Sequence, residues 1–206
     1  VEEKKPKTAV LAGGGFIGLE MAENLAEMGV SVTIVQRPKQ LLAPLDGDMA
    51  SFVHAEMRRH GVALRLGETV TGFRQDGDSV LTLLEDSVPL HSDMVLLAIG
   101  VTPDTHLAKD AGLRLGIRGS IAVNERMETS VPDIYAVGDA VEVTHFVTGQ
   151  KALISLVGPA NKQGRIAADN ICGGNSRFTG SQGSSVLKLF GLTAASTGIN
   201  EKAAQA

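Results

Sequence analysis

The sequence predicts an α/β fold, in which a parallel sheet with helices on both faces carries an added antiparallel β-meander. Three observations support this fold class. Apolar runs alternate with amphipathic segments from residue 8 to residue 66, and the links between them are short. Small strand-like runs separated by Asp-Gly then continue to residue 90. Beyond residue 100 the pattern changes to a short helix and isolated apolar runs, which indicates a second segment of different character.

The first expected strand, residues 8–12, leads directly into a glycine run that opens an amphipathic helix. Gly13, Gly15 and Gly18 match G-x-G-x-x-G, the pattern of a turn that receives a pyrophosphate. The first glycine permits a tight turn, the second lets backbone approach the phosphate, and the third lets the helix pack closely. The helix N-terminus directs unpaired N–H groups at the anion. A dinucleotide site is therefore expected, and the alternative is a glycine-rich turn without a ligand.

The helix after the glycines completes a βαβ unit. Its expected buried stripe consists of four apolar residues at helical spacing: Ile17, Met21, Leu25 and Met28. Gly29 supplies a residue suited to the helix C-terminus. Residues 30–35 are rich in β-branched side chains and predict a second buried strand. Together these elements predict a Rossmann-like unit of the usual ~30 residues.

The second strand ends in Gln36 and Arg37, where NAD-binding units typically place an acidic residue that holds the ribose. Glutamine can hydrogen-bond a ribose hydroxyl without repelling a 2′-phosphate. Arg37 can pair with that phosphate, or it can simply be solvated. The choice between NADH and NADPH therefore stays open, with NADH as the preferred interpretation.

The remaining elements of the first segment follow in order. A helix is expected from Asp46 to His60, and a third strand at residues 62–66. Three short runs predict the antiparallel meander: residues 69–73, 79–84 and 88–90. A buried strand at residues 93–100 ends in Gly100, which should lie near the nucleotide because ligands bind at the carboxyl ends of parallel strands. The alternative for Gly100 is a plain turn.

The second segment contains a strand-like run, residues 131–137, that ends in Gly138 and Asp139. A carboxylate at a strand tip can accept hydrogen bonds from a polyol or ribose hydroxyl, or it can merely cap the next turn. The other expected elements are a helix at 107–112, a strand at 120–123, a helical region at 151–171 broken near Gly158-Pro159, and a strand at 186–190. Asn200 is expected to cap a last helix, which the end of the chain cuts short.

Composition excludes several function classes. Hydrophobic content of 43% and charged content of 20% are typical of a globular protein. A net charge of −4, 3% aromatic residues and no tryptophan argue against nucleic-acid binding. No apolar run approaches the ~18 residues of a membrane span. Cys172 is the single cysteine, which suits a reducing cytoplasm. The five histidines show no metal-ligand spacing, so no metal site is expected.

Four segments together resemble the pyridine nucleotide–disulfide oxidoreductase family, and within it the branch of coenzyme A-disulfide reductases, NADH oxidases and persulfide reductases. They are GGGFIGLE at residues 13–20, AIGVTP at 98–103, residues 129–139 and SLVGPANKQGR at 155–165. The resemblance implies a linker at 1–7, an NAD(P)H-binding domain at 8–100 and the C-terminal part of an FAD-binding domain at 101–174. Residues 175–206 would be a linker and the truncated start of an interface domain.

The resemblance also assigns cofactor-binding residues. Those for NAD(P)H are Gly13, Gly15, Phe16, Ile17, Gly18, Glu20, Gln36, Arg37 and Gly100, with Glu20 near the nicotinamide. Those for FAD are Gly138, Asp139, Pro159 and Ala160, with Asp139 on the ribityl chain.

The implied reaction passes hydride from NAD(P)H to FAD and on to a small-molecule disulfide, persulfide or oxygen, in a cytoplasmic homodimer. The family's first FAD fingerprint and its redox-active cysteine are not matched in this sequence, and Cys172 is interpreted as structural. No catalytic residue is therefore expected in this chain, and the chain alone should be inactive. Two alternatives stay open: a flavin NADH reductase that delivers electrons to a redox-protein partner, and a non-catalytic NAD(H)-binding module.

Overall fold

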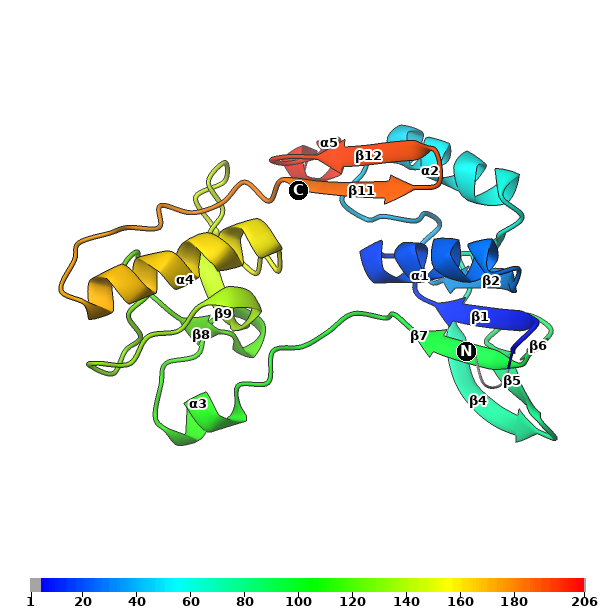
Figure 1. Ribbon diagram of the computed structural model, residues 1–206, viewed down its shortest axis with the longest axis horizontal. Coiled ribbons are helices and arrows are strands. Elements are labelled where there is room, and N and C mark those ends of the chain that lie inside the picture. Colours follow the sequence, from blue (N-terminus) through cyan, green and yellow to red (C-terminus); the bar gives the residue numbers. More distant parts are fainter. Residues whose placement is uncertain (1–4, 206) are drawn as a thin grey trace. The chain divides into compact units, whose positions relative to one another are not determined.

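A computed structural model describes residues 5–205, which form two compact units (Figure 1). The first unit comprises the chain up to Gly100 together with Val186–Ala195 and the chain from Asn200. The second comprises Val101–Ser185 and Ser196–Ile199. Residues 1–4 of the predicted N-terminal linker lie outside the described residues.

The first unit is built on a four-stranded sheet in the order β3-β2-β1-β7. The strands are β1 (Thr8–Ala12), β2 (Ser31–Gln36), β3 (Ala63–Leu66) and β7 (Met94–Leu97). Every pairing in this sheet is parallel, so the carboxyl ends of the strands lie at one edge. The predicted parallel sheet is confirmed.

The two faces of this sheet carry different coverings (Figure 1). Helices α1 (Phe16–Glu27) and α2 (Gly47–Arg59) share one core with Leu11 of β1. Val10 points the other way and packs with Leu84 of the antiparallel meander, which consists of β4 (Val70–Asp76), β5 (Ser79–Leu84) and β6 (Leu90–Ser92). The meander is confirmed. It also replaces the helices expected on the second face, because the chain between β3 and β7 forms strands.

Helix α1 buries a different face from the one predicted. Leu19, Ala22 and Leu25 are buried, whereas Ile17 and Met28 are 61% and 57% exposed. The buried stripe is displaced by about one residue because Gly18 lies directly under the glycine turn, which fixes the rotation of the helix. The predicted end of the helix is confirmed: Gly29 has φ +83°.

The second unit packs one long helix, α4 (Val157–Ile171), over a small sheet in the order β10-β9-β8. Its core includes Val141, Val143 and Ala167. The other elements are α3 (His106–Asp110), η1 (Ile117–Gly119), β8 (Ile121–Ala122), η2 (Gly138–Ala140), β9 (Val141–Thr144) and β10 (Lys151–Ala152).

Two predictions for this unit were wrong. The run at residues 131–137 is a turn with a single bridge, Glu128 to Tyr135, and the strand β9 comes after Gly138-Asp139. Pro132 has no N–H to donate to a ladder, and Asp133 has φ +64°, so this stretch cannot extend a strand. The helical region starts only at Val157, and Gly158-Pro159 lies in its first turn. A proline there breaks no hydrogen bond because the first N–H groups of a helix have no intrahelical acceptor.

A hairpin near the end of the chain belongs to the first unit. Strands β11 (Ser185–Leu189) and β12 (Leu192–Ser196) place Leu187 and Leu189 in the core with α1 and α2. The hairpin tip is held as well, because the Phe190 N–H donates to the Glu23 carboxylate at 2.5 Å. The last helix, α5 (Glu201–Gln205), is capped as predicted: Asn200 Oδ1 accepts from the Ala203 N–H at 2.8 Å.

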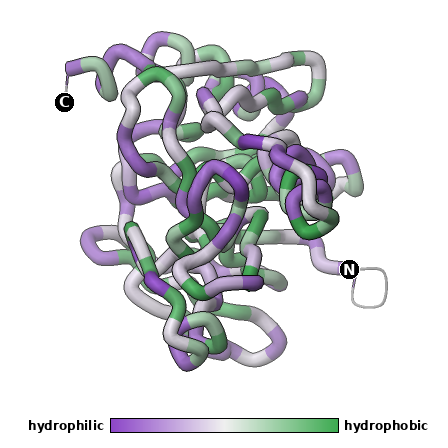
Figure 2. Tube along the Cα trace, turned by 90° about the vertical axis from the view of Figure 1, so that its left-hand side faces the viewer, coloured by the Kyte–Doolittle hydropathy of each residue, from purple (hydrophilic) through white to green (hydrophobic). Residues whose placement is uncertain are grey.

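Between residues 5 and 205, no helix has the length and apolarity that crossing a membrane requires. The Cα trace coloured by hydropathy accordingly alternates between short hydrophobic and hydrophilic segments (Figure 2).

Candidate dinucleotide-binding site

A cavity of about 550 Å³ lies at the carboxyl ends of the parallel strands of the first unit. Its wall consists of residues 12–15 at the end of β1, 35–38 at the end of β2, 68–70 between β3 and the start of β4, and 98–100 after β7. Open parallel sheets bind ligands at this edge, where successive loops diverge. The predicted dinucleotide site therefore coincides with a cavity of the first unit.

The three glycines of the turn occupy distinct environments. Gly13 has φ +111°, and a Cβ there would lie 2.3 Å from the Ala98 carbonyl oxygen. A Cβ on Gly18 would lie 2.1 Å from the Gly13 carbonyl oxygen, so the helix approaches the turn as closely as backbone allows. A Cβ on Gly15 would meet no atom within 4 Å. Gly13 thus forms the tight turn, Gly18 allows the close packing of the helix, and Gly15 leaves space for a phosphate, as the motif predicts.

The N-terminus of α1 is left open. Gly15 is its N-cap residue, no side chain caps the helix, and its first turn contains no acidic residue. The N–H groups of a first turn have no intrahelical acceptor and carry a partial positive charge. This end of the helix can therefore donate to an anion in the cavity.

The Gln36 side chain contacts the glycine turn directly. Its Oε1 accepts from the Gly14 N–H at 2.9 Å, and its Nε2 lies 3.4 Å from the Gln40 carbonyl oxygen. The other side of Gly14 is held too, because its carbonyl oxygen accepts from the Leu42 N–H at 3.0 Å. Sequence reasoning missed Gln40 and Leu42, since nothing in the segment after β2 signals its contact with the turn.

His54 anchors the segment that packs on the turn. Its Nε2 accepts from the Leu41 N–H at 3.0 Å, which requires a neutral imidazole. Burial, and then the charge of Arg58, lower the pKa of His54 below its ordinary value. Helix α2 is thereby linked to the glycine turn through the segment that contains Leu41.

The two charged residues on the cavity wall differ in their partners: Glu68 is paired with an arginine, and Arg37 is not paired with a described residue. Arg65 engages Glu68 with two hydrogen bonds, from Nε at 2.7 Å and from Nη2 at 3.1 Å. This contact raises the pKa of Arg65, and the two side chains form an ion pair. Arg37 is exposed on the same wall, at the end of β2. Among the described residues of this wall, Arg37 is therefore the charged group that a ligand anion can pair with.

The structure brings together five of the nine residues predicted for NAD(P)H. Gly13, Gly15, Gln36, Arg37 and Gly100 all line the cavity. The other four lie on α1 outside its wall: Gly18 is buried under the turn, Phe16 packs partly against the core, and Ile17 and Glu20 are exposed.

The residues predicted for FAD lie in the second unit. The Gly138 N–H donates to Gln163 Oε1 at 2.7 Å, and Gln163 is only 1% exposed on α4. Asp139, next to Gly138, is exposed. Pro159 and Ala160 lie in the first turn of α4, which no side chain caps. Sequence reasoning missed Gln163, which fixes the turn that carries Asp139.

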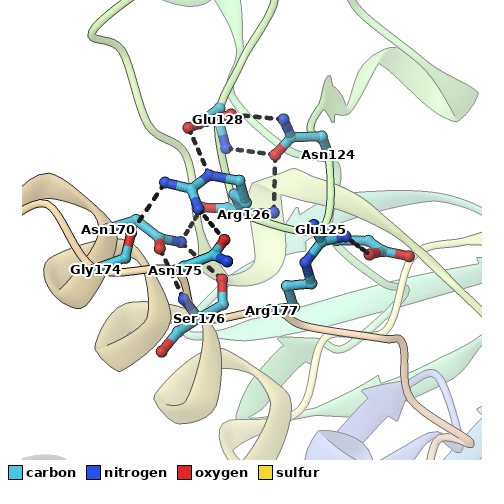
Figure 3. A network of polar contacts seen from close by, with 9 residues as sticks. All are labelled: Asn124, Glu125, Arg126, Glu128, Asn170, Gly174, Asn175, Ser176 and Arg177. Carbon is cyan, nitrogen blue, oxygen red and sulfur yellow. Dashed lines mark hydrogen bonds and ion pairs between the residues drawn. The ribbon is translucent and has the colours of Figure 1, made fainter.

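A polar network holds the opposite end of α4 (Figure 3). Asn170 donates from Nδ2 to the carbonyl oxygens of Arg126 and Ser176, at 3.0 and 2.9 Å. The Arg126 guanidinium donates to Glu128 at 2.9 Å. Hydrogen bonds from Asn124 and then from Arg126 lower the pKa of Glu128. The loop at residues 124–128 and the chain after α4 are therefore held to one another and to the C-terminal end of the helix.

No group of three or more metal-ligating side chains occurs in the part of the chain that the structure describes. Cys172, interpreted as structural from the sequence, lies at the C-cap of α4 and is exposed.

Comparison with known proteins identifies the family to which the chain is similar. A family model described as pyridine nucleotide-disulphide oxidoreductase matches residues 1–164. A relative from Pyrococcus abyssi, an NAD(P)H sulfur oxidoreductase (CoA-dependent), is 36% identical over 98% of this chain and 45% of its own length.

Two solved structures are similar to the chain in fold and in sequence. Reduced Bacillus anthracis CoADR-RHD superposes with a TM-score of 0.93 at 48% identity, covering 98% of this chain and 36% of its own. An NAD-dependent persulfide reductase from A. fulgidus gives a TM-score of 0.95 at 39% identity, covering 98% and 38%. The chain thus spans less than half the length of the curated relatives that it matches. With the family model covering most of its residues, the chain belongs to the pyridine nucleotide–disulphide oxidoreductase family.

Proposed function

We propose that this chain supplies the NAD(P)H-binding unit and part of the flavin site of an FAD-dependent oxidoreductase that reduces a disulfide or persulfide. The observation that carries the proposal is the cavity at the carboxyl ends of the parallel strands, into which the glycine turn opens at Gly15. When bound, FAD accepts a hydride from NAD(P)H and passes its electrons to the sulfur substrate.

The residues of the first unit bind and orient the dinucleotide. The open N-terminus of α1 donates backbone N–H groups to the pyrophosphate, and Gly15 lets the phosphate approach those groups. Gly100 after β7 forms the wall opposite the end of β2 and so helps to define the cavity width. Glu20 would approach the nicotinamide, as the family resemblance implies.

The second unit fits part of a flavin. Asp139 presents an exposed carboxylate, which can accept hydrogen bonds from the hydroxyls of a polyol chain. The uncapped first turn of α4, with Pro159 and Ala160, can receive a polar edge of the isoalloxazine or a phosphate. Gln163 holds the Gly138-Asp139 turn in place.

The substrate class follows from the relatives. The matched proteins named for sulfur or persulfide chemistry include the Pyrococcus abyssi relative and the A. fulgidus structure. We therefore propose a small-molecule disulfide or persulfide as the acceptor, with oxygen as a second acceptor, and a cytoplasmic homodimer as the full-length form. The exposed Cys172, at the C-terminal end of α4, is not assigned to this chemistry.

The test is a direct titration of the purified chain with NADH and with NADPH, followed by nucleotide fluorescence, together with a visible spectrum for flavin. We expect saturable dinucleotide binding and little retained FAD. Failure to bind either dinucleotide would overturn the assignment of the cavity. Tight retention of FAD would contradict the view that the second unit holds only part of the flavin site.

A further inference from the structure

We propose that dinucleotide binding is coupled to the docking of α5 through the strap, the segment at residues 40–45 that contacts the glycine turn on one side and α5 on the other. Asp46 and Lys202 are the positioning residues of this coupling. A docked α5 strengthens dinucleotide binding, and a bound dinucleotide holds α5 in place. The coupling rests on the proposed function, because it concerns the same cavity.

The strap orients a backbone N–H group at the start of α1. The Leu42 N–H donates to the Gly14 carbonyl oxygen at 3.0 Å. That carbonyl shares one peptide plane with the Gly15 N–H, which points away from it because the peptide is trans. The strap therefore sets the direction of an N–H group at the helix N-terminus, where the pyrophosphate is proposed to bind.

The strap keeps its shape through contacts with other elements. Leu42 is buried and has φ +49°, a left-handed conformation that is uncommon for a leucine. Such a conformation persists only where surrounding contacts hold it. On one side the Leu41 N–H donates to His54 Nε2 of α2 at 3.0 Å, and the Leu41 side chain is fully buried against Gly14. On the other side the contacts come from α5.

One side chain of the strap connects α5 to the strap backbone. Gln40 Oε1 accepts from Lys202 Nζ at 2.8 Å, while its Nε2 donates to the Leu45 carbonyl oxygen at 2.9 Å. The residue before α5 adds a second contact, since Asn200 Nδ2 donates to the Pro44 carbonyl oxygen at 3.3 Å. Undocking of α5 therefore releases both ends of the strap, at Gln40 and at Pro44.

Asp46, which follows the strap, serves α5 and not its own helix. It is the N-cap residue of α2, a position where an aspartate carboxylate usually accepts from the first turn of the helix that it precedes. It makes no such bond. Its two carboxylate oxygens accept instead from the N–H groups of Glu201 and Lys202, at 2.9 and 3.3 Å. Because α5 has only five residues, its helical form depends on this contact.

These contacts make binding and docking a linked pair of equilibria. If the dinucleotide binds more tightly when α5 is docked, a bound dinucleotide must favour docking by the same factor. Strand β12 leads into α5, so the occupancy of the cavity is transmitted to the C-terminal segment of the chain. Reciprocity distinguishes this coupling from a purely structural role of the same residues.

Two variants of the chain test the coupling, each titrated with NADH and with NADPH. Asp46→Ala removes both acceptors of α5 without removing a cap hydrogen bond from α2, and it should raise both Kd values by about fivefold. Lys202→Met removes only the contact with Gln40 and should raise them by about threefold. In the unmodified chain, saturating NADH should slow amide hydrogen exchange at Glu201 and Lys202 by about fivefold, measured by NMR.

Two control variants remove similar side chains that make no contact with the strap. Asp48 lies in the first turn of α2, and its Oδ1 accepts from the Met49 N–H at 2.7 Å. Lys188 is an exposed lysine on β11. Asp48→Ala and Lys188→Met should leave both Kd values unchanged. Thermal unfolding of every variant identifies any that fails to fold, and if Asp46→Ala does so, Lys202→Met and the exchange measurement decide.

Each outcome supports or overturns the coupling. If the unmodified chain binds neither dinucleotide, the proposed function fails and the coupling with it. If the chain binds NADH but exchange at Glu201 and Lys202 is the same with and without it, the coupling alone is overturned. Unchanged Kd values in a folded Asp46→Ala chain and in Lys202→Met have the same meaning, as does an equal loss of affinity in Asp48→Ala.

Discussion

Gly15 offers the sharpest test of the dinucleotide site, because the protein itself leaves space at this position. Its backbone has φ −84° and ψ −171°, a conformation that any residue adopts, and a Cβ would meet no atom within 4 Å. Gly15→Val should therefore fold. Its side chain would fill the space above the N-terminus of α1, where a pyrophosphate must approach the backbone. Losing two hydrogen bonds to a charged group, at ~1.5–3 kcal/mol each, amounts to ~3–6 kcal/mol.

A loss of that size raises the Kd for NADH by at least ~100-fold, at ~1.4 kcal/mol for each factor of ten. Fluorescence titration measures the Kd, and thermal unfolding should show nearly unchanged stability. Gly47→Val, at the first residue of α2, is the matched control and should leave the Kd unchanged. Gly18→Ala gives the opposite pattern, since its Cβ would lie 2.1 Å from the Gly13 carbonyl oxygen and stability itself should fall. A folded Gly15→Val chain with unchanged NADH affinity would refute the assignment.

Three further predictions concern polar contacts that support the two units. Gln163→Leu should destabilise the second unit by ~1–3 kcal/mol in denaturant unfolding, because the Gly138 N–H loses its buried acceptor; an unchanged midpoint would contradict the positioning role. The folded pKa of His54 lies below its unfolded value of about 6.5, so the unfolded state binds more protons between the two values and stability should fall as the pH drops below about 6.5. His54→Gln should flatten that part of the pH profile, and a profile identical to that of the unmodified chain would count against it. Hydrogen bonds from the N–H groups of Lys7 and Thr8 lower the pKa of Asp93, so its contribution to stability is present above the unfolded pKa and is lost as the pH falls through the folded pKa. Asp93→Asn should reduce this acid dependence in pH-dependent thermal unfolding, and an undiminished dependence would show that other carboxylates cause it.

Local patterns in the sequence predicted most elements of the first unit and the glycine turn, because their causes lie within a few residues. The turn after β1, the hairpin around Gly77 and the cap at Asn200 all follow from residue types that fix the backbone nearby. The buried face of α1 could not be chosen in the same way. Ile17 and Leu19 are equally apolar, and only the position of the glycine turn above Gly18 decides which one meets the core.

Local sequence patterns also could not predict the roles of Gln36 and Gln163. Gln36 and Gly14 are 22 positions apart, and Gln163 and Gly138 are 25 positions apart, so each pair meets only in the folded unit. A glutamine at a strand end or on a helix is usually solvated, and its sequence context carries no sign of a backbone partner. Only the folded path of the chain shows that these side chains accept hydrogen bonds from the N–H groups of Gly14 and Gly138.

The two units thus share one contact. In each, a glutamine side-chain oxygen accepts a hydrogen bond from the N–H of a glycine in a turn that is proposed to face a cofactor. The choice of glutamine over glutamate has an electrostatic reason. A carboxylate would make the same hydrogen bond, and a stronger one, yet it would place a negative charge beside the helix N-terminus that is to bind a phosphate. A neutral acceptor fixes the turn and preserves the positive potential. Gln36→Glu separates these two effects, because it retains the contact with Gly14 and adds only a negative charge beside the phosphate-binding turn.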